Sequence, residues 1–125
     1  AGIAFEPVDA DGDVTVVLAE PSTLPSYSPI CSASYSCRAG DFVVINAGNW
    51  ADATRSWRAG DGTLRDYRHM VVNHEMGHWL GRGHVGCGAD GALAPVMQQQ
   101  SKDLGGCDVN PWPLADERST PRFGG

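Results

Sequence analysis

Three histidines, a glutamate and a glycine lie close together between positions 74 and 84, where the chain reads His-Glu-Met-Gly-His-Trp-Leu-Gly-Arg-Gly-His. The stretch has the form H-E-x-x-H-x-x-G-x-x-H. His74 and His78 are four positions apart, so on an α-helix their side chains share one face, with Cβ atoms roughly 5–6 Å apart. Two imidazole nitrogens at that spacing can bind one metal ion. The pattern therefore predicts a helix that carries a metal site.

The third histidine, His84, is expected to reach the same ion only after the helix has ended. If the helix continued, His84 would lie about 9 Å further along the axis than His78, too far away to share a metal ion. The chain must therefore turn back. Gly81 is the residue at which it can do so, because glycine adopts the left-handed conformation at low cost. Gly83 adds freedom to the same turn.

Three neutral histidines without a cysteine are typical of a catalytic zinc ion, because they leave a fourth coordination position open for water. Zinc can lower the pKa of that water to about 7. Glu75 stands beside the first ligand, where its carboxylate can reach the water without binding the metal, so we expect it to be the general base. The alternatives are a chance match on an exposed helix, a structural zinc site, an inactive relative, or another metal in place of zinc.

The motif resembles that of the metzincins, zinc endopeptidases named after a methionine turn below the metal. Ala94-Pro95-Val96-Met97 follows the third histidine, and Met97 matches the position of the turn methionine. The resemblance implies that Met97 packs under the imidazoles without binding the metal. It also implies a small zincin-like α+β domain, in which a twisted mixed sheet packs on a buried active-site helix and a loop-rich lower part contains the methionine turn.

A longer resemblance covers roughly residues 31 to 113. It is to an uncharacterised family of secreted actinobacterial proteins with the same zinc signature. The stretches that carry it are Asp66-Tyr67-Arg68, Val72-Asn73-His74-Glu75, Ala94-Pro95-Val96-Met97-Gln98-Gln99-Gln100, Gly106-Cys107 and Asn110-Pro111-Trp112-Pro113. This resemblance supports the metzincin assignment and implies no particular substrate.

Two features depart from the metzincin pattern. Some metzincins have a tyrosine two residues after the turn methionine, which stabilises the oxyanion, and Gln99 occupies that position here. Gln98, Gln99 or Gln100 could donate an amide hydrogen bond to substrate, although shaping the wall of the specificity pocket is the role that we expect. Metzincins also usually have a long backing helix near the N-terminus. No helical pattern precedes residue 48, so we expect this helix to be missing or to lie upstream of Ala1.

Length and composition restrict the class of protein. The 125 residues are expected to form a single catalytic domain, 1–125, whose end, 113–125, is a partly ordered tail with one helical turn near 114–118. A net charge of −6 without clustered Lys or Arg argues against nucleic-acid binding. No apolar run approaches transmembrane length, so a membrane is not an expected partner either. We expect a monomer that is a mature or trimmed portion of its precursor.

Four cysteines predict two disulfide bonds, for which three pairings are possible. We favour Cys31–Cys37, which closes a short serine-rich loop, together with Cys87–Cys107, which spans the segment with Met97. Closing a loop of about twenty residues stabilises a protein by on the order of 3 kcal/mol in the entropic model. A second metal site made of cysteines is the alternative, but the chain has no C-x-x-C spacing. Disulfide bonds are typical of an oxidising compartment and agree with secretion.

Three strands are expected before the motif. Residues 3–8 alternate weakly and could form an edge strand, with Pro7 limiting its pairing. Residues 14–19 are apolar enough for a strand buried on both faces, and residues 41–47 form another strand. The segment between these two, 20–40, contains three prolines and many serines, so we expect a long loop.

The motif helix is expected to begin at Thr63, with Asp66 completing a capping box. Its apolar residues fall on more than one face, which predicts a helix that is buried on most sides. Residues 48–62 are expected to connect this helix to the preceding strand. They include Trp50 and Trp57, for which packing over the core is more common than lining a cleft.

These observations predict a secreted zinc endopeptidase that acts on a peptide or protein substrate. Zinc held by His74, His78 and His84 would polarise the carbonyl and activate water, while Glu75 transfers protons. One alternative is an amidase or hydrolase of cell-wall peptide that uses the same site. Another is an inactive zinc-bearing binding domain. The intact Glu75 argues against the latter, because a domain that needs zinc only for folding has no use for a general base.

Overall fold

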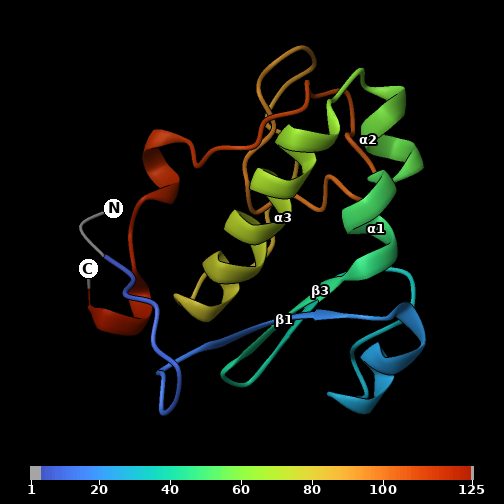
Figure 1. Ribbon diagram of the computed structural model, residues 1–125. Helices are drawn as coiled ribbons and strands as arrows, with labels where there is room; N and C mark the ends of the chain where they lie inside the picture. The colour runs from blue at the N-terminus through green and yellow to red at the C-terminus, as the bar shows by residue number, and fades with distance from the viewer. Residues whose placement is uncertain (1–3, 125) are drawn as a thin grey trace.

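A mixed three-stranded sheet lies against the longest helix in the computed structural model, which describes residues 4–124 (Figure 1). The central strand β3 (Phe42–Asn46) pairs in parallel with β1 (Thr15–Ala19) and antiparallel with β2 (Cys37–Ala39). Helix α3 (Leu64–Trp79) packs over β3 and β2. The expected α+β class with a mixed sheet packed on the motif helix is therefore confirmed.

Strand β3 is buried on both of its faces by other parts of the protein. Val43 and Ile45 face the main core, which they share with Trp57 and Tyr67. Val44 points to the opposite face, where it joins a smaller cluster around Leu24 and the first disulfide bond. Side chains alternate between the faces of a strand, so a continuous apolar run is the pattern expected for a strand buried on both sides.

Strand β1 differs from the prediction for residues 14–19, although the strand itself is present. Val16 and Leu18 are 55% and 59% exposed, so one face of β1 is not buried. The reason is the position of the strand: β1 is at the edge of the sheet, whereas α3 lies over β3 and β2. Hydrophobic content alone did not distinguish this half-exposed edge strand from a central one.

The predicted strand at 3–8 is not formed by residues 4–8, which have no regular structure, and Ile3 lies outside the described residues. Pro7 lacks the N–H group that a ladder needs. Phe5 instead packs its ring against Trp79, with centroids 6.2 Å apart.

Two elements lie within the segment 20–40 that was expected to be a loop. A 3-10 helix, η1 (Pro21–Ser26), begins at a proline, and β2 follows the serine-rich turn closed by the first disulfide bond. Strand β2 has three residues, too few for a recognisable alternation. It is nevertheless important, because it forms the edge of the sheet nearest the motif helix.

Two short helices, α1 (Ala47–Asp52) and α2 (Arg55–Ala59), form most of the connection between β3 and α3. Neither was expected from the sequence. Each is capped by a side chain from the preceding residue, Asn46 for α1 and Thr54 for α2. Trp57 on α2 is fully buried, so its expected packing in the core is confirmed.

Helix α3 begins as expected at Thr63, whose hydroxyl accepts a hydrogen bond from the Asp66 N–H at 3.1 Å. The helix buries Tyr67, Met70 and Val71 in the main core before it reaches the motif. This burial is expected to hold the first histidines rigidly, because cores are packed as densely as organic crystals. None of the described helices is long and apolar enough to cross a membrane.

Residues 113–124 of the segment that we expected to be a partly ordered tail lie beside the end of α3. Two 3-10 helices, η2 (Ala115–Glu117) and η3 (Pro121–Phe123), follow one another along the side of α3, the first at the predicted helical turn (Figure 1). Glu117 and Thr120 are buried. The Arg122 N–H donates to the Leu80 carbonyl, which fastens the segment to the end of α3.

Candidate metal centre

The chain turns back after α3 at Gly81, as the motif predicted. Gly81 has a φ of 100° and its N–H bonds to the His78 carbonyl, while the Arg82 N–H bonds to the Gly77 carbonyl, both at 3.0 Å. This pair of bonds is a Schellman motif, which favours glycine because of the left-handed conformation. A side chain at Gly81 would also press against Arg122, since a Cβ would lie 2.9 Å from its backbone nitrogen. The turn carries the chain back towards His84.

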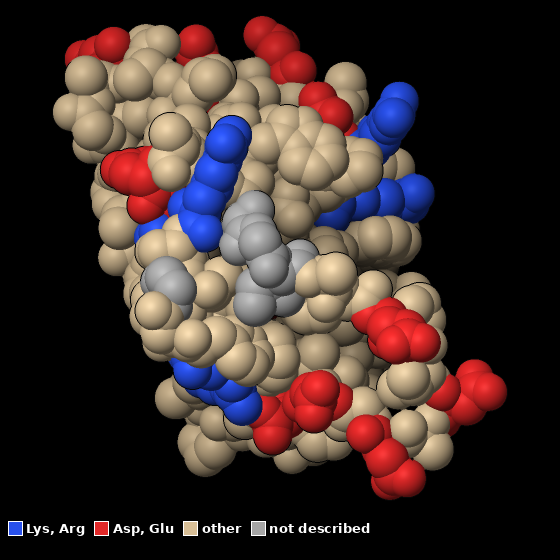
Figure 2. Space-filling view, turned by 90° about the vertical axis from the view of Figure 1, so that its left-hand side faces the viewer, with Lys and Arg blue, Asp and Glu red and all other residues tan. Residues whose placement is uncertain are grey.

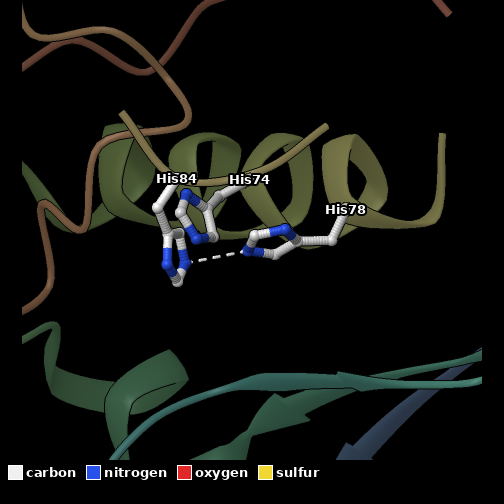
Figure 3. A group of neighbouring side chains, drawn as sticks. All are labelled: His74, His78 and His84. Atoms are coloured by element: carbon white, nitrogen blue, oxygen red, sulfur yellow. Dashed lines mark hydrogen bonds between the residues drawn. The ribbon is translucent and has the colours of Figure 1, made fainter. Parts of the chain in front are cut away.

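The three motif histidines face one another (Figure 3). His74 and His78 extend from α3, and His84 extends from the chain that follows the turn. One nitrogen from each ring lies within 4.8 Å of the others, and the Nε2 atoms of His78 and His84 are 3.0 Å apart. Two nitrogens that bind one zinc ion tetrahedrally lie about 3.3 Å apart. The three histidines can therefore hold a metal ion.

Hydrogen bonds at the far side of two rings determine which nitrogen is free. His74 Nδ1 lies 2.7 Å from the Val96 carbonyl oxygen, and His78 Nδ1 lies 2.8 Å from that of Arg82. A carbonyl only accepts, so each Nδ1 must carry the proton and donate it. In the neutral rings the Nε2 lone pairs are then available to a metal, the arrangement usual for metal-binding histidines.

The surroundings of the rings also favour their neutral form. Burial lowers the pKa of His74 to about 4, and it is the main cause of the lowered pKa values of His78 and His84. A histidine must be unprotonated to bind a metal. Three neutral nitrogen donors without a thiolate suit zinc and other borderline metals better than magnesium or calcium, which prefer oxygen.

The segment with Met97 passes directly behind the motif helix. Met97 is fully buried, and a Cβ added at Gly77 would lie 2.4 Å from its sulfur. Gly77 stands between His74 and His78, so the methionine packs on the helix at the site itself. The preceding Val96 carbonyl accepts the bond from His74, and the Met97 carbonyl accepts one from the Val85 N–H. The segment thereby supports the chain on both sides of Gly81.

Replacing Gly77 with alanine is expected to destabilise the protein by about 1 kcal/mol. Alanine in place of glycine stabilises a helix by about 1 kcal/mol, but forcing a methyl group into a filled core typically costs 1–3 kcal/mol. The control is Gly83→Ala, because a Cβ at Gly83 would meet nothing within 4 Å. Urea unfolding of both variants measures the difference. Equal or greater stability of Gly77→Ala would show that Met97 does not pack tightly here.

Glu117 binds the backbone of residues 94–97, which we call the methionine segment. The sequence alone did not reveal this role. Its two carboxylate oxygens accept hydrogen bonds from the Val96 and Met97 N–H groups at 2.7 and 2.9 Å. One of them also accepts from the Leu114 N–H at 3.0 Å. The contacts connect the C-terminal segment to His74 through Val96. Only the contact with Leu114 is local; Val96 and Met97 lie about twenty positions earlier, so the sequence does not reveal the contact with them.

The disulfide bonds have the favoured pairing, Cys31–Cys37 and Cys87–Cys107. The first ends at Cys37, the first residue of β2, and the second encloses the segment with Met97. A backbone bridge between Leu93 and Asp108 joins that loop to the chain just beyond Cys107. Two disulfide bonds are typical of a protein that resides in an oxidising environment, such as the extracellular space.

Glu75 lies beside the histidines, and no described residue pairs with its carboxyl group. Its side chain is 5% exposed and lines the same cleft as the three rings. Among the residues that the structure describes, no group donates a hydrogen bond to its carboxylate. Burial raises the pKa of Glu75 to about 8. A buried carboxyl without a partner is costly for stability, and such groups are concentrated at functional sites.

A cleft of about 830 Å³ opens above the histidines and Glu75. The loop and strand around Cys37 form one wall, and the residues after Met97 form another. Gln99 lines the cleft and takes part in no side-chain hydrogen bond with described residues. The side-chain amides of Gln98 and Gln100 instead donate hydrogen bonds to backbone carbonyls near the methionine segment, so these two residues stabilise the loop. Of the three glutamines, Gln99 alone has an amide available to a ligand.

Comparison with protein families identifies one match. The model of a family described as "Protein of unknown function (DUF3152)" matches residues 1–115. Neither the curated proteins nor the solved structures give a significant match. The matched region contains the three histidines, Glu75, Met97 and both disulfide bonds, so the function must be inferred from the chemistry of these residues.

Proposed function

The chain belongs to the DUF3152 family, whose description gives no function, and from its site we propose that the protein is a zinc-dependent endopeptidase. One observation carries the proposal. A buried carboxyl group, Glu75, which accepts no hydrogen bond from any described residue, lines the same cleft as three neutral histidines whose free nitrogens converge. A domain that needed metal only for its stability would be expected to pair or omit this carboxylate, because buried polar groups are normally satisfied.

We further propose that the domain is zincin-like and of the metzincin type. The support is local. Gly81 ends the motif helix, His84 follows the turn, and Met97 packs on the helix at Gly77. The small mixed sheet over α3 agrees with such a domain.

Each residue of the cleft has a separate role in the proposed reaction. His74, His78 and His84 would hold the zinc ion, with His74 oriented by Val96. When bound, zinc supplies a Lewis acid that polarises a carbonyl and lowers the pKa of water, and its charge favours the ionised form of a nearby carboxyl. Glu75 takes a proton from the attacking water and passes it to the leaving amine.

The substrate is proposed to lie extended along β2. This strand pairs with β3 on one side only, and Cys37 and Arg38 line the cleft. Main-chain pairing with a free strand edge is a common way to hold a peptide. The side-chain amide of Gln99 is available on the facing wall and could donate a hydrogen bond to the carbonyl oxygen as it becomes negative.

We also propose that the protein is secreted. Both disulfide bonds are formed, and reducing compartments rarely preserve such bonds. Extracellular peptides and proteins are therefore the proposed substrates. Cell-wall peptide is an alternative substrate for the same chemistry, although no described feature of the cleft favours it.

The test is to incubate the zinc-loaded protein with a diverse peptide library and to identify the products by mass spectrometry. We expect internal cleavage that stops when a chelator removes the metal and returns when zinc is added. A parallel incubation with purified cell-wall peptide examines the alternative substrate. Stoichiometric zinc without cleavage of either substrate would contradict the proposed enzyme and support a binding domain.

A further inference from the structure

The cleft has a charge opposite to that of the whole protein. The chain has nine Lys and Arg residues against fifteen Asp and Glu residues, a net charge of −6. Among the described residues, the cleft is lined by four of the cations and by one acidic side chain, Glu75. The four cations are Arg38, Arg82, Lys102 and Arg122. A positive cleft in an acidic protein favours an anionic group on the ligand.

Two of the four cations already form hydrogen bonds or an ion pair within the protein. Arg82 donates to the Asp116 carbonyl and to the Ser119 carbonyl and hydroxyl oxygens. Arg122 forms an ion pair with Asp41 at 3.0 Å and lies over the ring of Trp79. These contacts hold the C-terminal segment in place, so both guanidinium groups have a structural role.

Arg38 and Lys102 have no such role. Within residues 4–124, neither forms an ion pair or donates a side-chain hydrogen bond, and Arg38 Nε is buried without any partner. The ammonium group of Lys102 lies 4.9 Å from the centre of the Tyr35 ring, which helps to hold it beside the cleft. A buried N–H of a guanidinium group without a partner costs free energy unless a ligand accepts from it.

The two cations come from different parts of the chain and line the same cleft as the histidines. Arg38 belongs to β2, and Lys102 follows the methionine segment. Arg38 and Lys102 line the same cleft as His74, His78 and His84, so a ligand bound at the histidines lies near both cations.

From this arrangement we propose that the cleft contains a carboxylate subsite formed by Arg38 and supported by Lys102, so that the enzyme prefers peptides with an Asp or Glu side chain next to the cleaved bond. The proposal rests on the proposed peptidase function. Arg38 provides the main hydrogen bonds, because a guanidinium group can bind both oxygens of a carboxylate. Lys102 is exposed and contributes mainly charge.

A single carboxylate fits this cleft better than a polyanion does. On the face shown in Figure 2, Lys and Arg side chains are separated by neutral and acidic areas and form no continuous basic surface. The net charge of −6 would repel a long anionic chain. Two separate cations at the site can therefore select one acidic residue within an otherwise uncharged peptide.

The test uses pairs of peptides that differ only by Glu or Gln at one position, moved along both sides of the cleaved bond. The quantity measured is the ratio of kcat/KM for the two peptides. We expect the wild-type protein to prefer Glu by about tenfold at one position, as for a hydrogen bond to a charged group. Arg38→Gln should abolish the preference, and Lys102→Gln should reduce it about two- to threefold. Arg38→Lys, which keeps the charge, should restore part of it.

Arg65→Gln is the matched control, because it removes an exposed arginine from α3 outside the cleft and should leave the ratio unchanged. Each pair of Glu and Gln peptides is also prepared in two forms, one with a free C-terminus and one with an amidated C-terminus. A preference that disappears on amidation would assign the carboxylate to the chain end and overturn the side-chain proposal. A ratio that stays within twofold of the wild-type value in Arg38→Gln would overturn the subsite.

A binding measurement separates the subsite from the catalytic function. Fluorescence anisotropy with the same labelled peptides reports their affinity for the Glu75→Gln variant, whose cleft should retain Arg38 and Lys102. If the wild-type protein cleaves no peptide, the proposed function fails, but tighter binding of the Glu peptide that Arg38→Gln removes would still support the subsite. Equal binding of the Glu and Gln peptides would overturn it.

Discussion

Replacing Glu75 with glutamine should leave zinc bound and reduce kcat/KM for peptide cleavage by about 10²–10⁴-fold. This is the usual contribution of a general acid or base, and an amide cannot take the proton from water. Zinc should be retained because the three histidines, not Glu75, converge on one point. Zinc content is measured by mass spectrometry, and kcat/KM by cleavage of a peptide identified from the library.

Glu6→Gln is the control for this substitution, since Glu6 is exposed and lies before the sheet. It should retain the wild-type rate. Undiminished cleavage by Glu75→Gln would remove Glu75 from the mechanism. Loss of zinc together with activity would instead make Glu75 part of the metal site, contrary to its assignment.

Replacing Glu117 with glutamine should destabilise the protein by about 2–4 kcal/mol and weaken zinc binding by about tenfold. The carboxylate accepts from the N–H groups of Val96 and Met97, and an amide can satisfy only one of them. A buried donor left without a partner costs roughly 1–3 kcal/mol, and loss of the negative charge weakens the bond that remains. Zinc affinity falls because Val96 orients His74, and outer contacts of this kind typically contribute 10–100-fold.

Unfolding in urea and competition for zinc with a coloured chelator measure the two effects of Glu117→Gln. The exposed Glu20 provides the control, and Glu20→Gln should change neither stability nor affinity. A stability loss without any change in zinc affinity would mean that the methionine segment supports the fold but does not orient His74.

The convergence of the three histidines could be predicted from the sequence, because it depends on residues that are close together along the chain. The spacing of His74 and His78 requires a helix to be useful, and Gly81 is the residue that lets the chain turn before His84. These features depend on helix geometry and on the special conformation of glycine, both of which can be deduced without knowing the tertiary structure.

Features that depend on distant contacts could not be deduced. Glu117 looks like any acidic residue in a polar tail, yet it holds a loop whose residues lie about twenty positions earlier. The unpaired state of Arg38 depends on the surroundings of β2, itself too short to predict. The exposed face of β1 follows from which strands α3 covers. In each case tertiary packing, and not local propensity, decides the outcome.

One metal ion held by the three histidines is proposed to make the protein a peptidase. The most direct test is to remove all metal, add zinc in small steps, and follow the cleavage of a single peptide. We predict that the rate rises in proportion to zinc and levels off at one ion per chain, whereas His84→Ala, which lacks one ligand, needs far more zinc and stays slow. Cleavage that persists without metal, or that does not return with zinc, would contradict the claim.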